Sequence, residues 1–190
     1  QGKVRYVIMP NDNGTSYLPI LATSTMLPAF KNFFIQIGSG DALNFSLVNR
    51  AQKAPMYEEN VDEENIITTG IVLSRNEFSD PVGVVIGDNY TSEYEINADL
   101  QKWNNTNGFN FYALSSSERL SFIALDNVLA KNIALGYSVP EYGTYYISLD
   151  TTYTNTKLEA IYLTDTKRNI VTNLLVENYP ELKASQNFAV

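Results

Sequence analysis

The chain has 190 residues, a formal net charge of −8, no cysteine and no histidine. This length fits one domain, and we expect a single domain over residues 1–190. The composition excludes disulfides and thiolate metal sites, removes the usual general base near neutral pH, and disfavours nucleic acid as a partner because an acidic surface repels phosphates.

Short runs in which apolar and polar residues alternate recur along the whole chain, a pattern typical of half-buried β-strands. They are rich in Val, Ile, Thr, Tyr and Phe, which suit a pleated surface. In chain order, the predicted strands are Val4–Met9, Phe33–Ile37, Leu43–Val48, Ile66–Ser74, Val82–Ile86, Phe109–Ala113, Leu120–Leu125, Asn132–Tyr137, Tyr145–Leu149, Ala160–Thr164 and Ile170–Leu174.

Segments rich in Gly and Asn separate these runs, for example Asn11–Gly14, Gly38–Asp41 and Asn104–Gly108. Both residue types supply the positive φ angles that tight turns need. About a dozen short strands at this spacing predict an all-β fold, and we expect a two-sheet antiparallel β-sandwich with at most one short helix.

The expected helix is Asn97–Trp103, with Asn97 as its N-cap. The acidic stretch Glu58–Asn65 has no apolar stripe and is typical of a solvated loop. No apolar run approaches the roughly 20 residues that span a bilayer, so we expect no membrane insertion.

Seven stretches follow one another in a recognisable order of motifs. They include a proline followed by an aromatic pair (27–35), strands at 43–50 and 71–86, an acidic aromatic segment (93–102), the segment 111–122, a strand pair joined by a Gly-Thr-Tyr turn (133–149) and a last hairpin (161–179). In this order they resemble the β-sandwich region near the C-terminus of many secreted and surface proteins of Bacteroidetes. In that family the region often precedes a type IX secretion sorting tail or follows repeat arrays, and the resemblance covers residues 25–179.

The resemblance implies a non-catalytic accessory domain, for adhesion or as a spacer, in an exported protein. It also implies an extracellular or cell-surface location on a Gram-negative bacterium, with a cell-surface glycan or protein as partner. The chain departs from the family pattern at Glu181–Val190, which carries neither the expected final strand nor a sorting tail. The last strand is therefore expected to be missing, rearranged or supplied by a partner.

Catalytic chemistry is restricted, because nucleophilic triads usually need a histidine base. Paired carboxylates could in principle cleave glycosides. The acidic residues, however, lie mainly in turns and in the stretch Glu58–Glu64. We predict that the chain is not an enzyme, and a carboxylate-based glycoside hydrolase is the enzymatic alternative.

Three side chains form the candidate ligand site: Trp103, Asn104 and Asn105. A Trp beside polar residues motivates the alternative function of a carbohydrate-binding module, which would use exposed aromatic rings. The interpretation that the sequence favours is that Trp103 caps the core from the short helix.

Asp88, Asn89 and Glu93 form an oxygen-rich segment that could hold Ca²⁺, but the sequence favours the simpler interpretation of a turn closed by an Asx-type hydrogen bond. No other cofactor is expected. Asp150-Thr151-Thr152 resembles the acceptor of Bacteroidetes O-glycosylation, which makes Thr151 the candidate modified residue.

Overall fold

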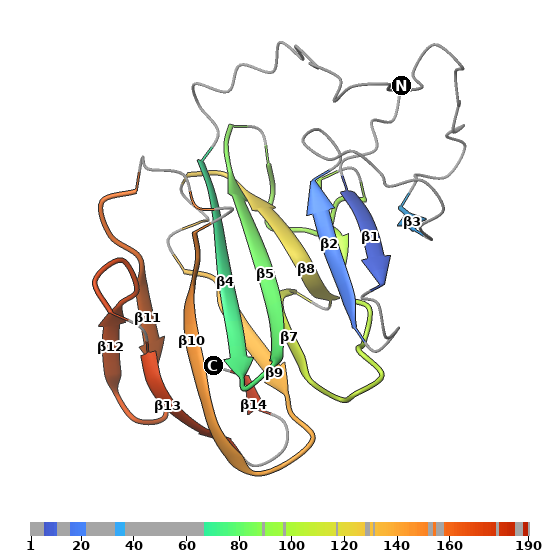
Figure 1. Ribbon diagram of the computed structural model, residues 1–190. Coiled ribbons are helices and arrows are strands. Elements are labelled where there is room, and N and C mark those ends of the chain that lie inside the picture. The colour runs from blue at the N-terminus through green and yellow to red at the C-terminus, as the bar shows by residue number, and fades with distance from the viewer. Residues whose placement is uncertain are drawn as a thin grey trace.

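The computed structural model describes residues 6–10, 16–21, 33–36, 67–88, 90–96, 98–116, 118–127, 130, 132–151, 154, 158–177, 179–184 and 188–189. Every regular element in these ranges is a β-strand (Figure 1), which confirms the all-β prediction. None of the described residues belongs to a helix long and apolar enough to cross a membrane. The predicted strand Leu43–Val48 and the acidic stretch Glu58–Asn65 lie outside the described residues.

The largest sheet has nine strands in the order β13-β10-β4-β5-β8-β7-β9-β14, with β6 pairing to β8 off this path. Figure 1 shows that the sheet is curled rather than flat. Its strands are β4 (Ile67–Arg75), β5 (Phe78–Ile86), β6 (Leu100–Gln101), β7 (Asn110–Ser115), β8 (Glu118–Leu125), β9 (Ala134–Ser138), β10 (Gly143–Asp150), β13 (Tyr179–Ala184) and β14 (Phe188–Ala189).

This sheet is mixed, so the prediction of purely antiparallel pairing is wrong. Strands β5 and β8 run parallel, with Gly83 opposite Phe122 and Ile86 opposite Leu125. A parallel pair needs a long connection between its strands, and residues 87–117 provide one. The other neighbours in the sheet are antiparallel; β4 and β5 form a nine-pair hairpin from Ile67↔Ile86 to Arg75↔Phe78.

Two smaller sheets flank the large one. Strands β1 (Tyr6–Pro10), β2 (Tyr17–Leu21) and β3 (Phe34–Ile35) form a three-stranded sheet in the order β2-β1-β3. Strands β11 (Tyr162–Asp165) and β12 (Ile170–Asn173) form a separate hairpin. In Figure 1 the three-stranded sheet and this hairpin lie on opposite sides of the large sheet.

Two apolar cores cover the two faces of β5 and β8. The larger core contains buried side chains from β4, β5 and β7 to β10, including Phe111, Tyr145 and Val82. The smaller core joins Ile8 of β1 to Val85 and Phe122. Because alternate residues of a strand point to opposite faces, Val84 enters one core and Val85 the other.

The predicted helix Asn97–Trp103 is wrong in its described part, Ala98–Trp103. Only one turn forms, through hydrogen bonds from Ala98 N and Asp99 N to Glu95 O, and β6 follows it. The Asp99 carboxylate accepts hydrogen bonds from Glu95 N and Ala124 N, which fixes the turn against β8. Leu100, fully buried in the smaller core, then favours an extended chain along β8.

The expectation that Glu181–Val190 lacks a final strand is also wrong. Strand β13 includes residues 181–184 and pairs with β10, and β14 pairs with β9. The segment lacks a long alternating run, but its short strands extend the large sheet at both of its ends.

Candidate functional site

Three aromatic side chains from separate parts of the chain meet beside β6. Tyr17 begins β2, Phe34 begins β3, and Trp103 follows β6. The ring centroids of Phe34 and Trp103 are 4.8 Å apart, and the Tyr17 ring meets Trp103 edge-on at 5.7 Å. Rings at these separations attract one another. We call Tyr17, Phe34 and Trp103 the aromatic cluster.

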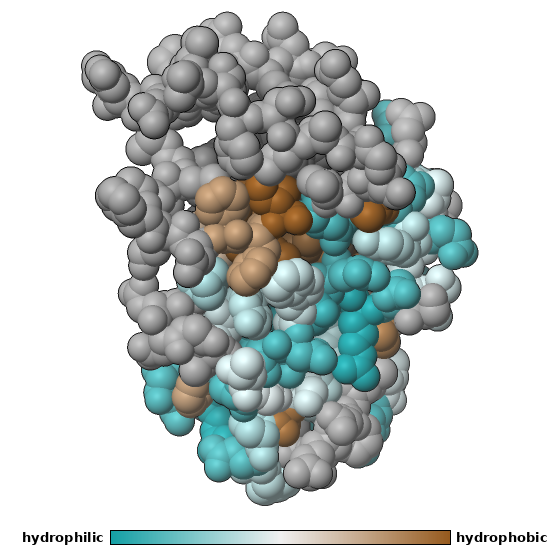
Figure 2. Space-filling view, turned by 90° about the vertical axis from the view of Figure 1, so that its right-hand side faces the viewer, coloured by the Kyte–Doolittle hydropathy of each residue, from teal (hydrophilic) through white to brown (hydrophobic). Residues whose placement is uncertain are grey.

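The aromatic cluster is open to solvent. Trp103 is 41% exposed and Phe34 is 40% exposed, while Tyr17 is half-buried. Trp103 therefore does not cap the core from a helix, as one interpretation of the sequence held. Figure 2 shows one face of the molecule, on which hydrophilic side chains cover much of the described surface, with a larger apolar area in the upper half and smaller ones elsewhere.

The two asparagines after Trp103 differ in their surroundings. Asn104 is exposed, whereas Asn105 is buried. The Asn105 side chain accepts a hydrogen bond from Tyr17 N at 3.0 Å and donates one to Phe109 O at 2.8 Å. Asn105 thus ties β2 to the loop that carries Trp103, and it positions the aromatic cluster from below the surface.

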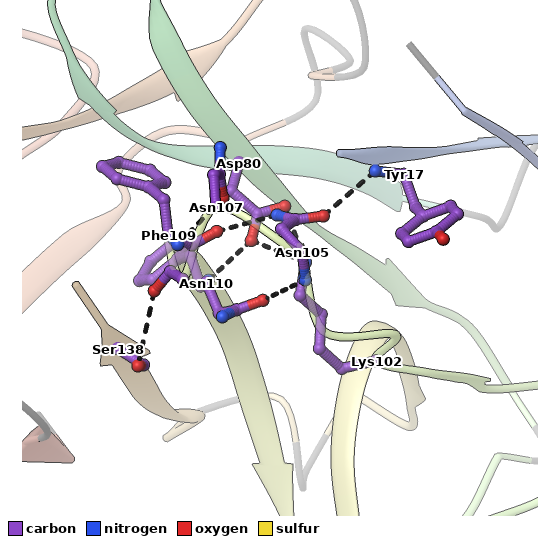
Figure 3. A network of polar contacts seen from close by, with 10 residues as sticks. Tyr17, Asp80, Lys102, Asn105, Asn107, Phe109, Asn110 and Ser138 are labelled. Carbon is purple, nitrogen blue, oxygen red and sulfur yellow. Dashed lines mark hydrogen bonds and ion pairs between the residues drawn. The ribbon is translucent and has the colours of Figure 1, made fainter. Parts of the chain in front are cut away.

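A buried ion pair lies beneath this loop (Figure 3). Lys102 Nζ donates to Asp80 Oδ1 at 2.7 Å and to Oδ2 at 2.5 Å, and Phe111 N donates to Oδ2 at 2.6 Å. The Lys102 and Asp80 side chains are 1% and 2% exposed. The pair therefore connects β5, the residue after β6 and the beginning of β7.

Burial changes the ionisation of both partners. It raises the pKa of Asp80 and lowers the pKa of Lys102, because an apolar environment disfavours charged forms. The attraction between the two charges opposes both shifts. The neutral form of the pair is therefore closer in free energy to the charged form than it is for the same groups in water.

No motif in the sequence marks Asp80 and Lys102 as partners. A signal for Asp80 was present, since alternation along the strand puts it on the same face as Val82 and Val84, which are buried. A carboxylate at such a position needs a buried partner. The identity of that partner depends on the chain turning at residues 95–99, which no local pattern indicated. Tyr17 and Phe34 were missed because their contacts with Trp103 join distant segments.

The candidate calcium ligands lie in and near the turn after β5. Asp88 and Glu93 are exposed, and Asn89 lies outside the described residues. The Glu93 carboxylate accepts a hydrogen bond from Ser116 Oγ at 3.2 Å. Within the described ranges, no three acidic side chains converge in a group that could hold a metal ion.

Thr151, the candidate glycosylation residue, is exposed immediately after β10. Three residues further along the chain, the Thr154 hydroxyl donates to Asp150 O at 2.9 Å and lies 3.1 Å from the Thr69 hydroxyl. Modification of Thr151 would thus occur at an accessible residue next to the end of β10.

A shallow depression lies elsewhere on the surface, at the β7–β8 turn. It is lined by Leu114, Ser115, Ser116, Arg119 and Ala134, none of which is acidic. The residues that line it therefore provide no pair of carboxylates of the kind that a glycoside hydrolase would use.

Asp165 and Tyr179 form a second buried polar contact, which holds β13 against β11. Tyr179 Oη donates to Asp165 Oδ2 at 2.6 Å, and the amides of Lys167 and Arg168 donate to Oδ1 at 3.0 Å. Burial acts to raise the pKa of Asp165, but these hydrogen bonds outweigh it and the pKa falls below its ordinary value of 3.8. The charged Asp165 carboxylate therefore stabilises the fold at pH values above its ordinary pKa. This contribution to stability is lost as the pH falls through the folded-state pKa.

We expect Tyr179→Phe to lower the free energy of unfolding by about 1–2 kcal/mol at neutral pH, because it removes a hydrogen bond to a charged group. The loss should shrink in acid, as the pH falls through the folded-state pKa of Asp165, which lies below 3.8. Urea unfolding at neutral pH and in acid measures the difference. Tyr146→Phe, at a tyrosine that is 47% exposed, is the control. An equal loss at both pH values would contradict the assigned role of the Asp165 charge.

Comparison with known proteins gives no match to a family model, to a curated protein or to a solved structure.

Proposed function

We propose that this chain is a non-catalytic accessory domain of an exported bacterial surface protein, and that its aromatic cluster makes adhesive contacts with cell-surface glycans. The observation that carries the proposal is the pair of exposed rings, Trp103 and Phe34, held side by side. Flat aromatic faces stack well on the apolar faces of sugar rings, because both surfaces lose contact with water when they meet.

The aromatic cluster is fixed in place before any ligand arrives. Tyr17 N donates to the side-chain oxygen of Asn105, and the backbone N–H of Asn105 donates to Asn110 Oδ1 at 2.6 Å. A site that is already ordered loses little conformational entropy on binding. The exposed amide of Asn104 adds both a hydrogen-bond donor and an acceptor for sugar hydroxyls next to the rings.

The export and surface location in this proposal rest on the resemblance over residues 25–179. The fold that goes with it is the two-sheet sandwich, with the three-stranded sheet stacked on β5 and β8. Packing of Ile8 against Val85 and Phe122 supports this stacking.

We expect Trp103→Ala to weaken glycan binding by about tenfold or more, because loss of one stacked ring costs on the order of 1.4 kcal/mol. Trp103→Phe should retain part of the affinity. Binding is measured on a glycan array and then by calorimetry with the best glycan. Tyr142→Ala is the matched control, because Tyr142 is 69% exposed and lies in the β9–β10 turn.

Equal binding by wild type and Trp103→Ala would remove the aromatic cluster from the proposal. An array on which the wild-type protein binds no glycan would overturn the adhesive role and favour the spacer role. Cleavage of an array glycan would restore the hydrolase alternative.

A further inference from the structure

A primary amine and a carboxyl group touch inside the protein, at Lys102 and Asp80. Lys102 Nζ is 2.7 Å from one carboxyl oxygen and 2.5 Å from the other, so it also lies next to the carboxyl carbon that joins them. Both side chains are almost completely shielded from water, at 1% and 2% exposure. Asp80 shares its strand face with Val82 and Val84 of the larger core.

We propose that Lys102 and Asp80 form an intramolecular isopeptide bond, an amide between Lys102 Nζ and Asp80 Cγ. The neutral amine attacks Cγ of the protonated carboxyl, and an N–C bond forms. The bond from Cγ to one carboxyl oxygen breaks, and that oxygen leaves as water with its own hydrogen and one from the amine. The reaction needs no oxidant, reductant or cofactor.

Three features of the site favour this reaction over the same reaction in solution. The fold holds the two groups in contact, which gives a large effective concentration. Burial favours their neutral forms, which are the reactive ones. Phe111 N, 2.6 Å from Oδ2, donates a hydrogen bond to the oxygen that becomes negative when the amine adds.

The product also suits its surroundings better than the reactants do. A neutral amide replaces two buried charges, whose desolvation is costly. The water released can leave the apolar core. The bond closes a loop from β5 to the residue after β6, and a cross-link of this kind restricts the unfolded chain as a disulfide does. It is independent of what the aromatic cluster binds.

The test is the intact mass of the purified, folded wild-type protein. We expect a mass about 18 Da below the sum of its residues, which is one water molecule. The full mass, unchanged after prolonged incubation of the folded protein, would overturn the proposal.

Digestion locates the bond. Trypsin cannot cut after an acylated lysine, so the peptides 76–102 and 103–119 should be replaced by one peptide, 76–119, that lacks one water. Cleavage after glutamate should leave the fragments 78–93 and 96–118 joined in one branched species. Recovery of separate peptides 76–102 and 103–119 would overturn the assignment to Lys102.

Two variants complete the test. Lys102→Arg keeps the positive charge but lacks a nucleophilic amine, and it should show its full mass. Lys167→Arg changes an exposed lysine and should keep the loss of water. A loss that persists in Lys102→Arg would place the reaction elsewhere and contradict the proposal. The wild-type mass and digests do not depend on whether either variant folds.

Discussion

Replacing Asp80 with Ala should lower the free energy of unfolding by about 3–5 kcal/mol, because the Lys102 amine is then left buried without a partner. The change also removes the acceptor of the Phe111 amide. Denaturant unfolding, followed by the fluorescence of Trp103 and by circular dichroism, measures the loss. We expect the midpoint to shift with little change in slope.

The control for this variant is an ion pair at the surface. Arg75 Nη1 lies 2.6 Å from Glu141 Oε1, with the two side chains 25% and 68% exposed. Glu141→Ala should leave the unfolding midpoint almost unchanged, because exposed pairs contribute little. A similar shift of the unfolding midpoint in both variants would show that the buried contact contributes no more to stability than the surface ion pair.

A double variant separates an ion pair from a covalent bond at this position. Asp80→Val with Lys102→Met removes both polar groups, and apolar replacements of a buried ion pair are often neutral or stabilising. If the wild type holds only an ion pair, the double variant should regain most of the stability. If the isopeptide bond is present, the double variant lacks a cross-link and should remain well below the wild type.

Gly83→Ala should lower the free energy of unfolding by about 1–3 kcal/mol, because the added methyl group meets a ring that cannot move away. A Cβ at position 83 would contact Cδ1 and Cε1 of Phe122 and lie 2.7 Å from its Cζ. Phe122 is the register partner of Gly83 and is only 4% exposed. Thermal and denaturant unfolding measure the effect.

Gly143→Ala is the matched control for this close approach. Its Cβ would also lie 2.7 Å from a neighbour, but that neighbour is the Arg75 guanidinium at the end of a flexible, partly exposed side chain. Gly143→Ala should therefore leave the free energy of unfolding almost unchanged. Adding Phe122→Leu to Gly83→Ala should cost less than the sum of the single changes. Full additivity would mean that the ring is not the source of the strain.

The sequence predicted strands where side chains alternate clearly. Val82, Val84 and Ile86 identify the second half of β5, and Tyr145, Ile147 and Leu149 identify β10. Strand prediction from the sequence failed where a proline interrupts the alternation of apolar and polar residues but the strand continues through it. Pro19 lies inside β2. Pro81 lies inside β5 at a point where that strand pairs only with β4, so its missing N–H costs little.

Strand order and the contents of the site were less predictable, because both depend on contacts between distant segments. The parallel pairing of β5 with β8 leaves no local mark in either strand. Trp103 could be proposed from its polar neighbours, yet its contacts with Tyr17 and Phe34 come from the smaller sheet. Asn105 was chosen with Trp103 as a ligand residue, although its side chain is buried.

The two outermost strands of the large sheet, β13 and β14, are separated by only three residues in the chain. An extended chain rises at most about 3.6 Å per residue, so Ala184 and Phe188 can be no more than roughly 14 Å apart. The two margins of the sheet must therefore approach each other. One short segment thus pairs with the otherwise open edges of β10 and β9, and until residues 179–189 have been synthesised both of these edges can pair with other molecules.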